Sequence, residues 1–364
     1  MIHSIYFNAS QNMHQLGDES VDLVVTSPPY PMIEMWDDIM SKQNHAIKEA
    51  LNSKQSRTAF ELMHCELDKV WRECWRVLKP GSFLCINIGD ATRTIAGEFA
   101  LYNNNTRIIQ CCEELGFINL PNILWKKTTN APNKFMGSGM LPCGAYVTLE
   151  HEWILIFRKG SKRTYKKIED KTARRDSSFF WEERNVWFSD IWDIKGVKQS
   201  IVNSTSRERN ASYPIELPYR LINMYSQKGD LVLDPFMGLG TTTMAAMLTE
   251  RNSVGYEIDF LLKPLIKDTL GAVSITKANN LIYERYKKHL DFIEERINLG
   301  KEVKYNNNNL GCKVMTGQET DISIHYIKDI SIIDDTSDLI INTEYYLDRP
   351  IYELPMNEKG TLFQ

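Results

Sequence analysis

The chain has 364 residues, 43% hydrophobic and 25% charged, and these ordinary globular values exclude a disordered or fibrous protein. The formal net charge of -4 means that any nucleic-acid partner must meet a local basic face. The seven cysteines have no CxxC spacing and no histidine pair beside them, so we expect neither a disulfide framework nor a metal. The N-terminus does not resemble a secretory signal, and no uncharged apolar run approaches the roughly 18 residues of a membrane span. We therefore expect a cytoplasmic protein without membrane contact.

Short apolar runs bounded by turn residues alternate with helix-period segments along the chain. This alternation is typical of an α/β protein in which helices cover both faces of a sheet. The expected strands are Ser4–Phe7, Asp22–Thr26, Phe83–Ile88, Ile123–Lys126, Trp153–Arg158, Leu231–Asp234 and Ser253–Glu257. Strands in this number predict one large sheet.

The second expected strand ends in the turn Thr26-Ser27-Pro28-Pro29-Tyr30. The prolines fix φ and cannot donate hydrogen bonds, so the carbonyls of Ser27 and Pro28 and the Ser27 hydroxyl stay free to accept from a substrate. Tyr30 adds a flat aromatic face. A plain strand terminator would also contain Pro-Pro, but open α/β sheets bind ligands at the carboxyl ends of their strands. We expect this turn to bind the substrate.

Three further segments follow this turn. The polar stretch Pro31–Thr58 is long and not strand-like, so we expect a loop that acts as a lid. An amphipathic helix is expected over Leu62–Leu78, ended by Lys79-Pro80-Gly81. Glycines and prolines in Thr128–Tyr146, with little periodicity, predict a mobile loop.

Basic residues concentrate between Arg158 and Arg175, where only Glu169 and Asp170 oppose them. Such a run is either a solvated loop or a surface for a polyanion. Aromatic residues follow it, and they either form a small core or contact a partner; they are Phe179, Phe180, Trp181, Trp187 and Trp192.

A second motif, Leu231–Thr243, combines a buried strand, a glycine turn and the start of a helix. Gly238 and Gly240 let the backbone approach a ligand closely, and the helix start offers free N–H groups. Glu257 lies about 20 positions after Asp234, where a carboxylate can bind two ribose hydroxyls. Since no GxxxxGK[ST] sequence is present, these features indicate a nucleoside site and not a nucleoside triphosphate site.

The two motifs together resemble the amino-methyltransferases of restriction-modification systems. Thr26-Ser27-Pro28-Pro29-Tyr30 precedes Asp234–Thr242 in the chain, which is similar to the permuted order of the family's beta class, and the resemblance covers about residues 1–262. It implies a Rossmann-like methyltransferase sheet, S-adenosylmethionine as cofactor, no metal, and double-stranded DNA as partner of a monomer or homodimer. Catalytic positions are implied at Ser27, Pro28, Pro29 and Tyr30. Cofactor-binding positions are implied at Asn8, Tyr213, Asp234, Phe236, Gly238, Gly240, Thr241, Thr242 and Glu257.

The resemblance also divides the chain. Residues 1–158 are expected to form the catalytic part, 159–210 a target-recognition insert whose basic run contacts phosphates, and 211–304 the cofactor-binding part. Residues 305–364 are expected to form an appended C-terminal module. One departure lies near the N-terminus, where the family often has Gly-Asp or Gly-Asn and this chain has Asn8.

The expected reaction is methyl transfer to N4 of a flipped-out cytosine. Ser27 replaces the carboxylate or carboxamide typical of the adenine enzymes, and a serine lacks the bidentate pairing that an amide offers adenine. Adenine-N6 transfer remains an alternative, as do an RNA or protein substrate and a catalytically silent, cofactor-binding DNA-recognition protein. Transfer to cytosine C5 is disfavoured because Cys143 lies far from both motifs.

Overall fold

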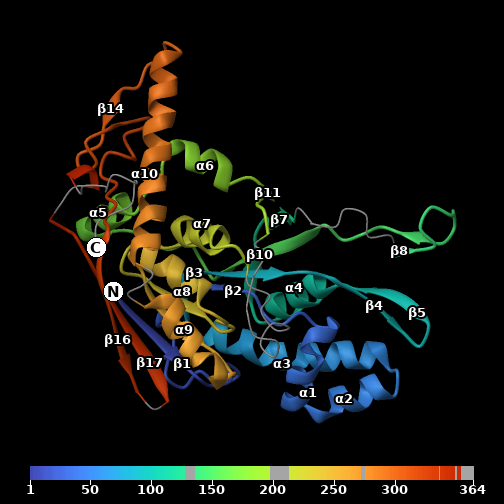
Figure 1. Cartoon of the computed structure of the whole chain (residues 1–364). Coiled ribbons are helices and arrows are strands. Elements are labelled where there is room, and N and C mark those ends of the chain that lie inside the picture. The colour runs from blue at the N-terminus through green and yellow to red at the C-terminus, as the bar shows by residue number, and fades with distance from the viewer. Residues whose placement is uncertain (128–135, 197–212, 272–274, 336, 349–350, 354–364) are drawn as a thin grey trace.

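A computed structural model describes residues 1–127, 136–196, 213–271, 275–335, 337–348 and 351–353 (Figure 1). One 11-stranded sheet dominates this part of the chain. Its order is β11 (Ile191–Asp193), β7 (Ile123–Lys126), β10 (His151–Lys159), β3 (Leu78–Ile88), β2 (Val21–Thr26), β12 (Leu231–Asp234), β13 (Asn252–Tyr256), β1 (Ile2–Tyr6), β17 (Asp338–Tyr345) and β16 (Ile327–Asp334), with β6 (Phe117–Asn119) also paired to β10. All seven expected strands belong to this sheet, which confirms the Rossmann-like α/β fold.

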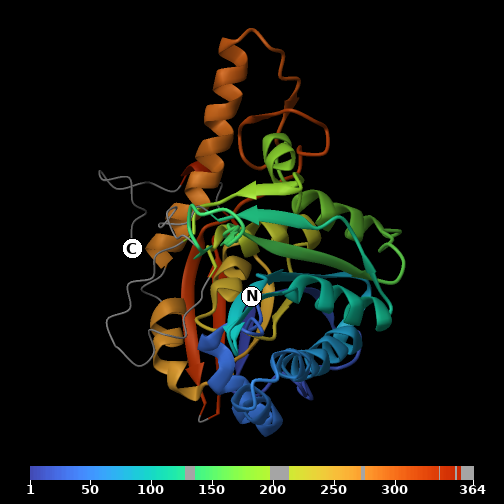
Figure 2. The same ribbon diagram turned by 90° about the vertical axis from the view of Figure 1, so that its right-hand side faces the viewer.

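Helices cover both faces of the sheet. Both faces are apolar because successive side chains of a strand point to opposite faces of the sheet. On β2, Val24 faces one core cluster, whereas Leu23 and Val25 face another. The first cluster is covered by α1 (Asp37–Gln43), α2 (His45–Asn52), α3 (Ser56–Val77) and α4 (Asn104–Glu114), and the second by α7 (Glu216–Tyr225) and α8 (Thr241–Leu248). Both layers are visible in Figure 2.

The remaining elements surround this sandwich. They are η1 (Glu34–Trp36), β4 (Ala91–Ile95), β5 (Glu98–Tyr102), β8 (Met136–Gly137), β9 (Ala145–Tyr146), α5 (Ile168–Asp176), α6 (Trp181–Trp187), η3 (Phe260–Leu262), α9 (Lys263–Leu270), α10 (Ile275–Asn298), β14 (Tyr305–Asn306), β15 (Lys313–Val314) and η5 (Ile351–Glu353). No described helix is long and apolar enough to cross a bilayer. The described residues also contain no cluster of histidine, cysteine and acidic side chains able to hold a metal.

The directions of the strands define two edges of the sheet. Strands β2, β3, β12, β13 and β1 run parallel, so their carboxyl ends share one edge. β10 runs antiparallel to β3, with Trp153 opposite Ile88 and Arg158 opposite Phe83. Its end therefore lies at the amino edge of the parallel strands.

Two hairpins extend from the carboxyl edge. β4–β5 and β8–β9 project to the same side of the sheet in Figure 1, and Phe99 stacks on Tyr146 with ring centroids 4.5 Å apart. The loop expected over 128–146 is thus a hairpin in part, with Cys143 exposed between its strands. Residues 128–135 lie outside the described part of the chain.

The prediction of a loop over residues 31–58 is wrong, because most of this segment is helical. α1 and α2 are short, and their few buried residues, among them Met40, Ile47 and Ala50, are spread over a polar sequence. Asn44 caps α2 by accepting the N–H of Ala46 at 3.1 Å. With seven and eight residues, α1 and α2 are too short for a helical periodicity to be recognised from the sequence.

The two long strands of the C-terminal segment, β16 and β17, belong to the main sheet and do not form a separate module. β17 pairs antiparallel with β1, with Ile2 opposite Asn342, and β16 pairs with β17 at the edge of the sheet. Leu339 and Ile341 join the core cluster that contains Ile5. Apolar burial against the first strand therefore ties this segment to the catalytic sheet.

The insert after β10 contacts α10 through α6. Arg285 on α10 forms an ion pair with Glu183 at 2.7 Å, and Trp181 stacks on Phe292 with centroids 5.9 Å apart. The insert's most buried aromatic side chains, which serve packing, are Phe180, Trp187 and Trp192.

Candidate active site

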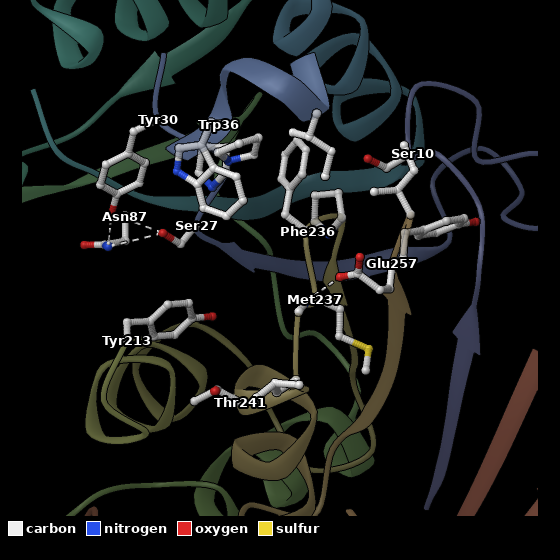
Figure 3. Close-up of a pocket in the computed structure, with 18 of the residues that line it drawn as sticks. Ser10, Ser27, Tyr30, Trp36, Asn87, Tyr213, Phe236, Met237, Thr241 and Glu257 are labelled. Carbon is white, nitrogen blue, oxygen red and sulfur yellow. Dashed lines mark hydrogen bonds between the residues drawn. The ribbon is translucent and has the colours of Figure 1, made fainter. Parts of the chain in front are cut away.

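A cavity of about 530 Å³ opens at the carboxyl edge of the sheet, where the two sequence motifs meet. Figure 3 shows two halves: Ser27, Tyr30 and Asn87 lie on one side and Glu257 on the other. Phe236 lies between them. Expected site residues that line the cavity are Asn8, Ser27, Pro28, Pro29, Tyr30, Tyr213, Phe236, Gly238, Thr241 and Glu257.

The first half contains a hydrogen-bonded network that ends at Glu152. The Ser27 hydroxyl lies 3.2 Å from the Tyr30 hydroxyl, which donates to the Glu152 carboxylate at 2.8 Å. The Asn87 amide donates to both Tyr30 and Glu152 at 2.8 Å. The Lys127 ammonium pairs with the other Glu152 oxygen. When Ser27 donates to Tyr30, its oxygen accepts a long hydrogen bond of 3.4 Å from the Asn87 amide and keeps one further lone pair for a substrate N–H.

Burial keeps the Tyr30 hydroxyl of this network protonated. Desolvation, together with the nearby charge of Glu152, raises the pKa of Tyr30 well above its usual value, so its hydroxyl remains a donor. The Asn87 Oδ1 atom is buried and has no hydrogen-bond partner within the described part of the chain.

The network contains three residues that were not expected from the sequence, Asn87, Lys127 and Glu152. Glu152 and Asn87 each interrupt an otherwise apolar strand, and both are buried, with 8% and 4% of their surface exposed. The sequence signal for these two site residues was a charged or amide side chain within an apolar strand, because a buried polar group requires a partner.

The second half of the cavity is centred on Glu257, which follows β13. Its carboxylate accepts the N–H of Gly238 at 2.9 Å and that of Asp259 at 2.8 Å, one at each oxygen. Burial raises the pKa of Glu257 to about 7. Each oxygen keeps a lone pair for a hydroxyl donor, so the carboxylate fits the ribose of S-adenosylmethionine.

Asp234 and Thr242, both expected to contact the cofactor, do not line the cavity. Asp234 is buried and accepts from Thr26 at 2.6 Å and from Thr242 at 2.5 Å. Tyr213 does line the cavity, and its hydroxyl also bonds to Thr242. These contacts connect β2, which leads into the Pro-Pro-Tyr turn, with the segment around the glycine turn. Asp234 and Thr242 thus support the positions of the two motifs.

Gly240 also lies outside the cavity lining. Its φ is +85°, which favours glycine at this helix cap, and an added Cβ would lie 2.8 Å from the Leu270 side chain. Close packing and the turn therefore explain this glycine, whereas Gly238 is the glycine that lines the cavity.

The segment after the Pro-Pro-Tyr turn covers the cavity. Trp36 ends η1 and Ile39 lies on α1, and both line the cavity together with Ile33 and Met35. These lining residues belong to the segment that was expected to act as a lid, and here the segment is helical.

Comparisons with known proteins agree with this site. The family model named N6_N4_Mtase, a DNA methylase family, matches residues 21–268. The chain is 50% identical over 326 residues to the type II methyltransferase M.MthZI of Methanothermobacter thermautotrophicus, covering 89% of this chain and 90% of that one. It is 50% identical over 280 residues to the type II methyltransferase M.MjaI of Methanocaldococcus jannaschii, covering 74% of this chain and 91% of that one.

A solved structure is also similar. It is that of a proposed DNA modification methylase from Thermus thermophilus complexed with S-adenosyl-L-methionine, with 31% identity and a TM-score of 0.57 over 73% of this chain and 92% of that one. The chain thus belongs to the N6/N4 family of DNA methylases, as a DNA methyltransferase of the restriction-modification type that depends on S-adenosylmethionine.

Proposed function

We propose that this enzyme is site-specific and methylates N4 of a cytosine that has been flipped out of double-stranded DNA. The observation that carries this assignment is the Ser27 hydroxyl, which lines the cavity at the position where a carboxylate or carboxamide would favour adenine. A serine whose own proton is donated to Tyr30 accepts a hydrogen bond from the cytosine amino group, and it lacks the bidentate pairing that an amide offers adenine.

Activation of the amine follows from the acceptors around it. The exocyclic nitrogen is a poor nucleophile because its lone pair is conjugated with the ring. Ser27 Oγ and the Pro28 carbonyl accept its two hydrogens and localise the lone pair on nitrogen. Fixed positioning of this kind lowers barriers by roughly 7–11 kcal/mol in favourable cases.

The network also provides a route for the proton that the amine loses. S-adenosylmethionine supplies a sulfonium methyl group, and its bonding electron pair stays on sulfur when nitrogen takes the methyl. The nitrogen then releases one proton, which passes through the Ser27 and Tyr30 hydroxyls to the Glu152 carboxylate. The 3.2 Å and 2.8 Å contacts along this path support the assignment.

Base flipping costs a few kcal/mol, which contacts in the cavity offset. Tyr30, Trp36 and Phe236 provide aromatic faces within the cavity lining. Catalytic use of the Tyr30 hydroxyl does not prevent its ring from stacking on a base.

We further propose that the insert over residues 159–210 contributes to recognition of the target sequence through its last part, which adjoins the catalytic cavity from β11 onward. Gly196 lines the cavity, and β11 pairs with β7, which leads into Lys127. Residues 197–210 lie outside the described part of the chain. Exchange of this segment between relatives should transfer site preference, and an unchanged preference would favour the β4–β5 and β8–β9 hairpins.

Binding of the cofactor should depend on the charge of Glu257. Ribose hydroxyls donate to the ionised carboxylate, whose pKa burial raises to about 7, so affinity should fall up to tenfold per pH unit below that value. Glu257→Gln should weaken binding by about 10–100-fold at pH 8, since a hydrogen bond to a charged group contributes about 1.5–3 kcal/mol. Its affinity should also vary little with pH.

Calorimetry of S-adenosylmethionine binding at pH 6, 7 and 8 checks both expectations. Glu284→Gln, at an exposed position of α10, is the control for a glutamate-to-glutamine change outside the cavity. Equal pH slopes for wild type and Glu257→Gln would assign the pH dependence to another group.

The proposed function is tested by incubating the protein with labelled S-adenosylmethionine and duplex DNA and identifying the methylated nucleoside. N6-methyladenine would indicate the alternative reaction. Cofactor binding without transfer to any DNA would indicate a silent recognition protein.

A further inference from the structure

A second cavity, of about 1050 Å³, lies at the amino edge of the parallel strands. It is lined by Asp22 on β2, by Gly81–Phe83 on β3 and by Arg158 on β10. Glu152 of the catalytic cavity lies six residues earlier on β10, and at about 3.3 Å per residue the two cavities are about 20 Å apart along that strand. In Figure 1, α5 lies on the side of the sheet away from the β4–β5 and β8–β9 hairpins. We name this second site the basic cavity.

The lining of the basic cavity is strongly positive. Its cationic side chains are Arg158, Lys162, Arg163, Lys171, Arg174, Arg175 and Arg184. The acids that line it are already engaged: Asp22 pairs with Lys79 at 2.8 Å and Asp230 with Arg163 at 3.1 Å. Glu319 accepts the N–H of Trp181 at 2.9 Å.

Several of these cations are free to meet an anionic partner. Lys162, Lys171, Arg174 and Arg184 form no ion pair with any carboxylate in the described ranges. The Arg174 guanidinium lies 4.5 Å from the ring centroid of Tyr165. In a chain with a net charge of -4, this local excess of positive charge favours a polyanion.

The arrangement matches nucleic acid. Lysine and arginine side chains neutralise phosphates, and aromatic rings such as Tyr165 and Phe188 stand beside them in the same lining. The long lining also suits an extended backbone better than a single small anion.

The two cavities lie at opposite edges of one sheet, about 20 Å apart along β10. A duplex whose target base enters the cavity at the carboxyl edge would have to run along the strands over that distance to reach the basic cavity. The separation therefore favours a different duplex segment at the basic cavity, in place of the expected contact between the basic run and the target duplex.

We propose that the basic cavity is a second DNA site that binds the sugar–phosphate backbone of another duplex segment while the catalytic cavity acts on its target base. This inference rests on the proposed function only in taking duplex DNA as the substrate. Its consequence is that one chain binds two short duplexes, of which one is methylated.

The test compares the wild type with Lys162→Gln/Lys171→Gln/Arg174→Gln, a triple variant of exposed residues. Titration at low salt with a duplex of about 12 bp containing the methylated site should give two duplexes per chain for the wild type and one for the variant. The variant's kcat/KM for methylation of that duplex should stay within twofold. Because each neutralised phosphate contributes about -0.9 to the salt slope, the slope for long DNA should become shallower by about 2–3.

The matched control is Lys287→Gln/Lys288→Gln/Lys301→Gln, which removes the same charge from exposed positions on and just after α10. It should leave stoichiometry and salt slope unchanged. A wild type that binds one duplex per chain would overturn the proposal, as would a basic-cavity variant that loses methylation of the short duplex. Failure of the proposed function is distinct, because the wild type would then methylate no cytosine.

Discussion

Replacing Ser27 with alanine should lower kcat by about 100–1000-fold while S-adenosylmethionine binds within twofold of the wild type. Loss of one preorganised polar group at a reacting centre has an effect of about this size. The hydroxyl lies in the half of the cavity opposite Glu257, so the cofactor site should be preserved.

Single-turnover methylation and calorimetry measure the two effects of Ser27→Ala separately. Ser53→Ala, at an exposed turn after α2, is the control for a serine-to-alanine change without a catalytic contact. Near wild-type turnover in Ser27→Ala would contradict the role of the hydroxyl in binding the amino group.

Glu152→Gln should lower kcat by about 100-fold or more, within the range of about 10²–10⁴ for loss of a general base. The change preserves the shape of the side chain and its acceptor for the Tyr30 hydroxyl, but it removes the charge that takes the proton and pairs with Lys127. Affinity for S-adenosylmethionine should stay unchanged.

Glu152→Asp separates a proton-accepting role from a structural one, because it keeps the carboxylate and should recover part of the kcat that Glu152→Gln loses. Tyr30→Phe, which keeps the aromatic face but interrupts the hydroxyl path, should also lose most turnover. Glu150→Gln, an exposed neighbour two positions earlier, should behave like the wild type. Wild-type kcat in Glu152→Gln would show that the proton leaves by another route.

The sheet was predictable because each strand is a short apolar run with clear boundaries. Leu231–Asp234 and Ile123–Lys126 match β12 and β7 without any change of boundary. The Pro-Pro-Tyr turn and the glycine turn were also predictable as neighbours, because both follow strands whose carboxyl ends share an edge.

Other features depend on contacts that the sequence does not display. Glu152 becomes part of the site only because Tyr30, Asn87 and Lys127 converge on it from three other segments. Arg158 lies far from the catalytic cavity because β10 runs antiparallel to β3, and strand direction is not encoded in an apolar run. Asp234 is buried and accepts hydrogen bonds from two threonines, and it does not line the cavity.

The most direct test of cytosine-N4 specificity is nucleoside mass analysis of duplex DNA after incubation with the enzyme and S-adenosylmethionine carrying a deuterated methyl group. Ser27→Ala, examined in parallel, controls for methylation by contaminating enzymes. The account predicts labelled N4-methylcytosine as the product from the wild type and little label from Ser27→Ala. Labelled N6-methyladenine as the product would contradict the assignment based on Ser27.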